Sequence, residues 1–293
     1  MISPAYSIVI ATYERPALLR DALASVARQT HAPARIVIVD SSTGDESEKV
    51  GREFSLPILY RRAERPSAAL QRNQGFRDVE TPLVAFIDDD VVLSPDVFEK
   101  VCAVFASRPD TGGVSARGND VNHRSPSGLL RRYYRLQAGF DDPTFGARLF
   151  GPAINCFPCY AEQREELIPA DWLNLTCVMF RSDAFGAELF PTFDGYSFGE
   201  DVHLSARIGR KWPLYFHRDA CYEHFPQMSP AKQNHFQIAR MSARNRRLIA
   251  RDVQGMCGWE LFWKDTLHRV FVSVFLARTR PSGWMKKIAG NWL

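Results

Sequence analysis

The sequence predicts an α/β protein: a mostly parallel central sheet flanked by helices, followed by a C-terminal helical extension. Three observations lead to this prediction. Over the first hundred residues, short apolar runs rich in β-branched residues alternate with amphipathic stretches. Such alternation is typical of right-handed β–α–β units, which build a parallel sheet. After residue 228 the strand pattern stops and basic amphipathic segments follow.

The first half contains four expected strands with helices between them. We expect the strands at 6–12, 34–40, 56–61 and 82–88. Helices are expected over 16–29, 67–79 and 94–105. Pro16 suits a first helical turn because its missing N–H needs no partner there, and the Ser67 hydroxyl can cap the next helix. These elements predict β–α–β units that form one parallel sheet.

The second half is less regular. A loop-rich stretch follows residue 117 and lasts to about residue 171, after which a strand is expected at 172–181 and a helix at 199–212. One or two short strands are expected within 213–225, and two helices over 231–253 and 259–277. We therefore divide the chain into a body, residues 1–228, and a tail, residues 229–293. The body divides again at residue 116.

Charge is spread unevenly over the 293 residues. The whole chain carries a formal charge of +4, whereas the tail has twelve Lys and Arg against three acids, a charge of +9, which leaves −5 for the body. The six cysteines are scattered, so a small disulfide scaffold is not indicated. The N-terminal stretch lacks the pattern of a signal peptide, and no apolar run reaches the ~18 residues that span a bilayer. We expect a cytoplasmic protein.

Polar residues end three of the expected strands. Thr12, Asp40 and Asp88 stand where the chain leaves the sheet, the edge at which parallel sheets bind ligands. Asp88, Asp89 and Asp90 are consecutive, and adjacent carboxylates repel one another unless a cation or strong donors are present. Alternation along an extended chain would turn Asp88 and Asp90 to the same side, as a site for Mg²⁺ or Mn²⁺. The alternative is a solvated acidic turn before a helix.

Several segments, in order, resemble the family 2 glycosyltransferases, which have the Rossmann-like GT-A fold. The segments are SIVIATYERPALLRDALASVARQT, IVIVDSSTGD, QRNQG, FIDDDV, FDGYSFGEDVHLSARIGRKW and ACYEHF, together spanning roughly residues 5–225. One departure concerns the second strand, where the usual pair of acids is reduced to Asp40 followed by Ser41. The resemblance implies a nucleotide-diphosphate-sugar donor, an inverting single displacement and a divalent cation, Mn²⁺ or Mg²⁺.

The resemblance also implies where the donor and the cation bind. The metal ligands would be Asp88, Asp90 and His224. Residues implied in nucleotide-sugar binding are Thr12, Tyr13, Glu14, Asp40, Arg72, Asn73, Asp88 and Asp89. Within this set, Arg72 would pair with the diphosphate, and Asp40 would accept a hydrogen bond from the imide of a uracil or thymine base. A strand-capping histidine and plain surface arginines are the structural alternatives.

Catalysis and acceptor binding are implied for the second half of the body. Asp201 would be the general base that accepts the proton of the acceptor hydroxyl, and Glu200 would orient sugar hydroxyls. Both acids also suit the positive end of a helix dipole, so helix capping is the alternative. Trp172 and Asn174 are expected beside the acceptor. Residues 1–116 would then be the nucleotide-sugar-binding half of the GT-A domain, and residues 117–228 the acceptor-binding half.

The expected activity is transfer of a sugar from a UDP- or dTDP-sugar to a glycan or lipid-linked acceptor in cell-surface polysaccharide synthesis. A sugar-1-phosphate nucleotidyltransferase is the second possibility, but the loop after the first strand, ATYERPA, lacks the glycines of those enzymes. A non-catalytic glycan-binding subunit is the third, although the acids that it would have lost are present. No nucleic-acid recognition motif accompanies the basic tail.

The tail has two interpretations. In the first, its helices pack on the body as a pair. In the second, the apolar residues of 259–275 and the basic residues after them hold the chain to anionic lipid at the inner face of the cell membrane.

Overall fold

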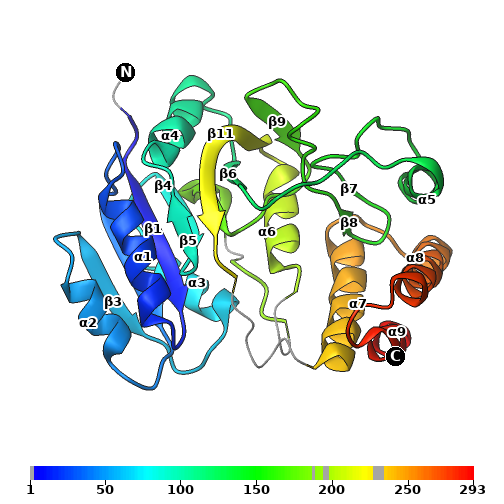
Figure 1. Ribbon diagram of the computed structural model, residues 1–293. Helices are drawn as coiled ribbons and strands as arrows, with labels where there is room; N and C mark the ends of the chain where they lie inside the picture. The colour runs from blue at the N-terminus through cyan, green and yellow to red at the C-terminus, as the bar shows by residue number, and fades with distance from the viewer. Residues whose placement is uncertain (1–2, 187–188, 194–197, 227–233) are drawn as a thin grey trace.

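The computed structural model describes residues 3–186, 189–193, 198–226 and 234–293. Its centre is a nine-stranded sheet whose first half is parallel (Figure 1). From the edge inward, this half consists of β3 (Ile58–Arg62), β2 (Arg35–Asp40), β1 (Tyr6–Thr12) and β4 (Leu83–Asp88). The parallel pairing of these four strands confirms the prediction from the alternating sequence.

The second half of the sheet is mixed. β10 (Cys177–Arg181) is antiparallel to both β4 and β6 (Gly113–Gly118), and β11 (Leu214–His224) is parallel to β6. Two short strands, β5 (Val91–Leu93) and β9 (Leu167–Ala170), pair antiparallel with β11. A separate hairpin contains β7 (Leu149–Phe150) and β8 (Ile154–Asn155). The sheet is therefore less parallel than its first hundred residues suggest.

Two hydrophobic cores cover the two faces of the sheet. Along β1, Ile8 and Ile10 point into one core and Val9 into the other, as expected of a strand buried on both faces. The first core is completed by α1 (Pro16–Ala27), α2 (Glu46–Arg52) and α4 (Val97–Ser107). The second is completed by α3 (Ala68–Phe76), α6 (Glu200–Gly209) and the end of α7 (His235–Asp252). This three-layer arrangement is the α/β architecture that we predicted.

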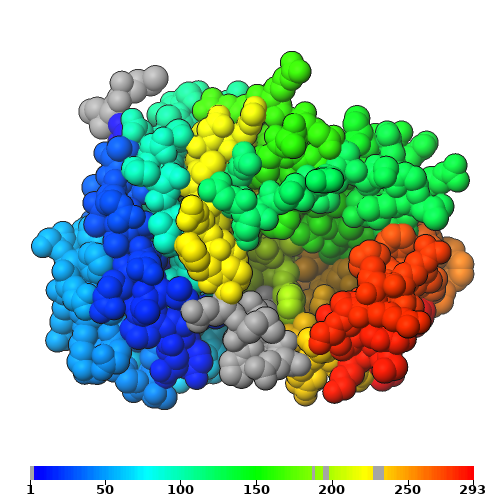
Figure 2. Space-filling view, in the orientation of Figure 1, coloured from blue at the N-terminus to red at the C-terminus, as the bar shows by residue number. Residues whose placement is uncertain are grey.

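The tail helices gather at one end of the molecule. Figure 1 shows α8 (Gly258–Thr279) next to α5 (Gly128–Ala138), and α9 (Trp284–Trp292) beyond α8 and against α7, all away from β1–β3. The ring of Tyr133 on α5 stacks on Phe271 of α8 with 3.9 Å between centroids. Helices α7 and α9 approach so closely that a Cβ at Gly290 would lie 2.2 Å from the carbonyl oxygen of Phe236. In space-filling view the tail forms the outer surface here (Figure 2).

Several expected boundaries were wrong. The chain from Trp172 to Thr176 is not part of a strand, so the strand expected at 172–181 begins at Cys177. The residues 213–225 contain a single long strand, β11, rather than short ones. Helices α2 and α9 were not expected. No helix in the described ranges combines the length and the apolar character needed to cross a membrane.

Candidate active site

Strand ends bring the expected polar residues to one edge of the sheet. Ala11 of β1 is paired with Asp88 of β4, and Thr12 with Asp40 of β2. The Thr12 hydroxyl donates to Asp89 Oδ2 at 2.7 Å. The register of three parallel strands thus places residues that are up to 77 positions apart in contact.

The three consecutive carboxylates have different neighbours. Strand β4 ends at Asp88, and Asp89 and Asp90 form a turn, so the alternation expected of an extended chain stops there. Arg15 Nη1 lies 3.2 Å from Asp89 Oδ1 and 3.3 Å from Asp90 Oδ2. Asp88 instead accepts a hydrogen bond from Arg72 Nη2 at 2.7 Å. Asp89 and Asp90 therefore both pair with the guanidinium group of Arg15. Asp89 does not point away from Asp90, which corrects the expected alternation.

Burial sets the protonation behaviour of these acids. It raises the pKa of Asp89 to about 6, against the opposing effects of the Thr12 hydroxyl and the charge of Arg15. It also raises the pKa of Asp88, an effect that Arg72 opposes and the nearby charge of Asp90 reinforces. A neighbouring positive charge therefore opposes the effect of burial on the pKa of each carboxylate.

His224 reaches the acidic turn because β11 pairs with β5. The pairing places His224 opposite Val91, the residue that follows Asp90. His224 Nε2 lies 3.5 Å from Asp90 Oδ1, and its Nδ1 lies 3.2 Å from Asp120 Oδ2. The hydrogen bond to Asp90 is the main reason that the His224 pKa is raised to about 9, with Asp120 adding to it. Asp120 was not predicted from the sequence, since no motif marks the loop after β6.

The donor atoms around Asp90 suit a divalent cation. Carboxylate oxygens of Asp88 and Asp90 with an imidazole nitrogen of His224 are ligands that Mn²⁺ accepts, and the oxygens suit Mg²⁺. Among the described residues, no three His, Cys, Asp or Glu side chains are already arranged as a metal cage. Arg15 and His224 instead pair with the carboxylates. The carboxylates and the imidazole therefore fit a divalent cation that would replace the positive charges now beside the carboxylates.

Arg72 connects the acidic turn to the start of α6. Its Nη2 bonds Asp88, and its Nη1 bonds Glu200 Oε1 at the first turn of α6. Arg72 is 6% exposed; its burial alone would lower its pKa, but the two carboxylates outweigh burial and raise it. Both terminal nitrogens thus bond carboxylates here, and the contact expected between Arg72 and a diphosphate stays a prediction.

Asp201 lies beside this network. Its Oδ1 accepts a hydrogen bond from the Val202 backbone N–H at 2.8 Å. Burial raises the Asp201 pKa to about 6, an effect that the Val202 N–H and the charge of Arg72 oppose. A carboxylate with such a pKa is ionised at neutral pH and basic enough to accept a proton. The preceding part of the quoted motif, residues 194–197, lies outside the described residues.

The loop after β1 is tied to the loop after β2. Glu14 adopts a φ of 53° and its Oε1 accepts hydrogen bonds from the backbone N–H and the hydroxyl of Thr43, both at 2.8 Å. These bonds lower the Glu14 pKa. Tyr13, which follows the last residue of β1, is 47% exposed. The loop therefore presents an aromatic ring next to the sheet edge.

Asp40 is fully buried. Its carboxylate accepts hydrogen bonds from the Tyr60 hydroxyl and the Ser42 backbone N–H and contacts Arg62 Nη1 at 3.3 Å. A nucleotide base would have to displace one of these partners, so the expected imide contact stays a prediction.

Asn73 exchanges two hydrogen bonds, both 2.9 Å, with the backbone of Phe190 and so anchors the segment that precedes α6.

The two residues expected beside the acceptor differ in position. Trp172 is 1% exposed, packs edge-on against Phe157 and Phe216, and donates its Nε1–H to the carbonyl of Cys156. It belongs to the core and presents no ring face to a sugar, which corrects the expectation. Asn174 is half-buried, and its Nδ2 donates to the Tyr222 hydroxyl at 3.3 Å.

The site residues lie in a segment that matches a known family model. The model of Glycosyl transferase family 2 matches residues 7–161, which include the first three strand ends and the acidic turn. The chain belongs to glycosyl transferase family 2. The remaining site residues, on α6 and β11, come after residue 161 and lie outside the matched segment.

Curated relatives extend the family 2 likeness over the whole chain. Validoxylamine A glucosyltransferase of Streptomyces hygroscopicus subsp. limoneus is 34% identical over 98% of this chain and 65% of its own length. The protein of the same name from subsp. jinggangensis is 33% identical over 98% of this chain and 70% of its own length. The chain therefore spans about two-thirds of these relatives. With this family and these relatives, the chain is a glycosyltransferase.

Solved structures show the same fold for this family 2 chain. The crystal structure of S. aureus TarS 1–349 superposes with a TM-score of 0.55 at 15% identity, covering 96% of this chain and 74% of TarS. The same protein in complex with UDP-GlcNAc gives a TM-score of 0.55 at 16% identity, covering 96% and 75%. These likenesses establish the GT-A fold that the resemblance implied.

Proposed function

We propose that this glycosyltransferase moves a sugar from a UDP- or dTDP-sugar to a hydroxyl of a glycan or lipid-linked acceptor, with inversion at the anomeric carbon. The observation that carries the proposal is the ion network in which Arg72 joins Asp88 to Glu200, next to Asp201. This network connects the acidic turn, which would bind a cation, to the helix that carries the candidate base. The names of the relatives support a glucosyl donor, and the TarS complex supports a UDP-sugar.

Each residue has a defined part in the proposed reaction. Asp201 accepts the proton of the acceptor hydroxyl while the acceptor oxygen forms its bond to the anomeric carbon. The bond from that carbon to the diphosphate oxygen breaks, and the nucleoside diphosphate leaves with the electron pair. A divalent cation held by Asp88, Asp90 and His224 would stabilise the charge of the leaving diphosphate. Arg15, which now neutralises the acidic turn, lies where it can also bond a phosphate oxygen.

Other residues are assigned to contacts with the nucleotide base and with the acceptor. The exposed ring of Tyr13 can stack on the nucleotide base, with Thr12 and Glu14 shaping the loop that carries it. Asn174, whose Oδ1 accepts a hydrogen bond from the Thr176 hydroxyl at 3.2 Å, is assigned to the acceptor. Extension of a surface polysaccharide is the process in which such a transfer would serve.

The experiment is transfer from a panel of UDP- and dTDP-sugars with Mn²⁺ or Mg²⁺. Validoxylamine A and simple glycans serve as first acceptors, and release of the nucleoside diphosphate is measured together with the anomeric configuration of the product by NMR. We expect an inverted product with one nucleotide class. A product that retains the donor configuration, or release of pyrophosphate instead of a nucleoside diphosphate, would contradict the proposal.

A further inference from the structure

Helix α8 buries three charged side chains against the protein and exposes several large apolar ones. The buried residues of the helix are Leu261, Lys264, Asp265 and Arg269. Phe275 is 56% exposed. Four other apolar residues, Trp259, Phe262, Val270 and Val274, are 75%, 60%, 45% and 49% exposed. Their spacing is close to whole helical turns, so they lie on one side of the helix. We call these four residues the apolar stripe.

A buried ion cluster fixes this orientation. Asp265 Oδ2 accepts hydrogen bonds from Arg247 Nε at 2.7 Å and Arg269 Nε at 2.8 Å, and Asp265 Oδ1 contacts Arg246 Nη2 at 3.2 Å. Rotation of α8 to bury the apolar stripe would carry Asp265 and Arg269 together away from Arg246 and Arg247 of α7. Breaking a buried charge network is costly, so the outward position of the stripe is built into the fold.

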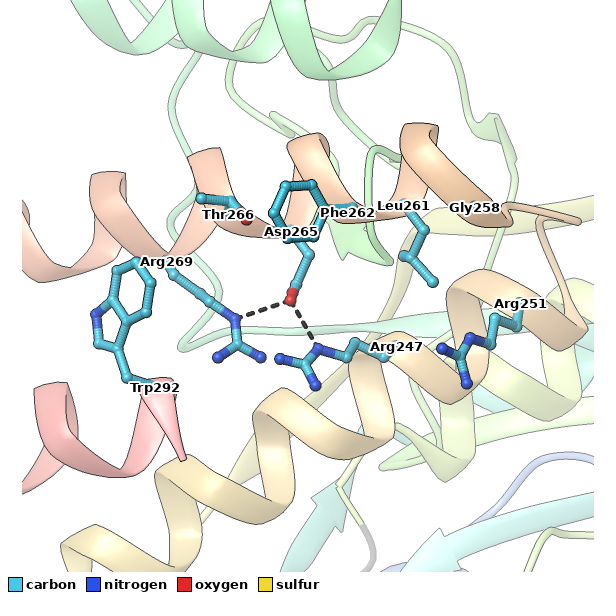
Figure 3. Close-up of a pocket in the computed structure, with 9 residues that line it drawn as sticks. All are labelled: Arg247, Arg251, Gly258, Leu261, Phe262, Asp265, Thr266, Arg269 and Trp292. Carbon is cyan, nitrogen blue, oxygen red and sulfur yellow. Dashed lines mark hydrogen bonds and ion pairs between the residues drawn. The ribbon is translucent and has the colours of Figure 1, made fainter.

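The cluster opens into a groove lined by arginines. Along α7, Arg240, Arg244, Arg247 and Arg251 follow one another at intervals of four, three and four residues, which places them on one side of the helix. With Arg269 they line two adjoining hollows of about 420 and 640 Å³ between α7, α8 and α9. Figure 3 shows the first of them, which Arg247, Arg251 and Arg269 line. Among the described residues that line them, Asp265 is the sole acidic side chain. We call this the arginine groove.

The arginine groove and the apolar stripe meet. Phe262 belongs to the stripe and also lines the groove, and Trp292 of α9, 44% exposed, lines the groove from the other side. Four of the six tryptophans of the chain lie after residue 258, and tryptophan is the side chain best suited to a boundary between water and lipid. One continuous surface thus combines guanidinium groups with large apolar side chains.

We propose that the arginine groove and the apolar stripe form a docking surface for an anionic phospholipid bilayer. Guanidinium groups bond phosphate oxygens in a bidentate manner, and the groove offers an excess of them over its single carboxylate. The stripe beside it would enter the boundary between headgroups and acyl chains, as interfacial helices do. This inference rests on the tail alone and does not depend on the proposed reaction.

A second copy of the chain is a poorer partner for this surface. A two-fold dimer places the same patch of both copies in contact, and here each patch belongs to a tail with a charge of +9. Like charges brought together in this way oppose association. An anionic lipid surface instead complements the charge and accepts the apolar side chains at the same time.

The test is co-sedimentation of the full chain with vesicles at low salt, compared between phosphatidylglycerol and phosphatidylcholine. We expect binding to the anionic vesicles that falls steeply as salt rises, because the electrostatic part is screened. Trp259→Ser combined with Phe262→Ser should weaken binding at least about tenfold. Both side chains are exposed, so an unchanged thermal melt shows that the variant is folded.

Charge is tested by a matched pair of double variants. Arg240→Gln with Arg251→Gln removes two exposed charges from the groove and should weaken binding to the anionic vesicles about 30-fold. Arg28→Gln with Arg52→Gln removes two exposed charges from the opposite end of the chain and should leave binding close to that of the wild type. Equal losses in both pairs would mean unspecific attraction and would overturn the proposal.

Two further outcomes would overturn the docking surface. One is the absence of binding to anionic vesicles at low salt. The other is self-association, seen in sedimentation velocity, that the Trp259→Ser and Phe262→Ser changes abolish while vesicle binding is unaffected. Neither outcome bears on sugar transfer, so failure of this inference is distinguishable from failure of the proposed function.

Discussion

Arg72 bonds Asp88 and Glu200 at the same time, with one terminal nitrogen on each carboxylate. The two acids are far apart in the chain: Asp88 ends β4, and Glu200 begins α6, 128 residues after Arg72. One buried guanidinium therefore sets the position of the helix that carries Asp201 relative to the acidic turn. Its loss should affect both stability and transfer.

Arg72→Gln is expected to destabilise the protein by about 3–5 kcal/mol, because it leaves two carboxylates without their buried counter-charge. Urea denaturation measures the change. The matched control is Arg61→Gln, which removes an exposed arginine that makes a bidentate pair with Asp78, and should cost less than about 1 kcal/mol. If the two variants unfold at the same urea concentration, Arg72 does not have the linking position that we assign to it.

Asp201→Asn should abolish transfer and yet stabilise the fold above neutral pH. Because burial raises the Asp201 pKa to about 6, the folded state keeps a proton that the unfolded state has released, and stability falls as pH rises toward and through 6. Asparagine does not titrate, so at pH 8 the variant should be more stable by about 2–3 kcal/mol. Thermal melts at pH 4.5 and pH 8 measure this. If Asp201→Asn changes the stability by the same amount at pH 4.5 and at pH 8, Asp201 is not a buried carboxyl group that titrates near pH 6.

Transfer should become slower in mild acid, because the general base becomes protonated. Below about pH 6, Asp201 is protonated and cannot accept the proton of the acceptor, so kcat/KM should fall about tenfold for each pH unit. Asp89 has a similar pKa and lies beside the expected donor site. Measuring the nucleotide Kd over the same range separates the two, since Asp89 should alter donor binding and Asp201 should alter turnover.

Binding of a divalent cation should release a proton. The pKa of His224 is raised to about 9 mainly by its hydrogen bond to Asp90, so His224 is protonated at pH 7 and must lose that proton to become a ligand. Calorimetry with Mn²⁺ in two buffers of different ionisation enthalpy counts the protons released. We expect close to one for the wild type and fewer for His224→Gln; equal counts would place the ion elsewhere.

Asp120 should act as a positioning residue for His224. Its contact with Nδ1 leaves Nε2 directed at Asp90. Asp120→Asn should weaken Mn²⁺ affinity about 10-fold or more while UDP binding without metal stays the same. The second measurement is needed because a general loss of structure would lower both affinities.

The parallel half of the fold was predictable because it is encoded locally. Strands such as β1 and β4 are apolar runs with β-branched residues that are buried on both faces, and Thr12 and Asp88 mark where they end. The segment 172–181 shows the limit of this signal. It reads as one strand, but the chain turns at Asn174 and Thr176 before β10 begins.

Contacts made across the sheet could not be predicted in the same way. Asp120 meets His224 only because β11 pairs with β6 on one side and with β5 on the other, and no local pattern announces that pairing. Helix α8 is a second case. Its apolar residues suggest a face packed on the body, but the ion cluster around Asp265 turns that face outward. Long-range ion pairs override helix amphipathicity there.

Calorimetry of UDP and dTDP with the wild type and Asp90→Ala, each with and without Mn²⁺, tests whether the acidic turn holds a divalent cation for the donor. We expect one of these nucleotides to bind the wild type tightly only when Mn²⁺ is present, and Asp90→Ala to remove this effect of the metal. Tight metal-independent binding by the wild type, or a metal effect that persists in Asp90→Ala, would contradict this expectation.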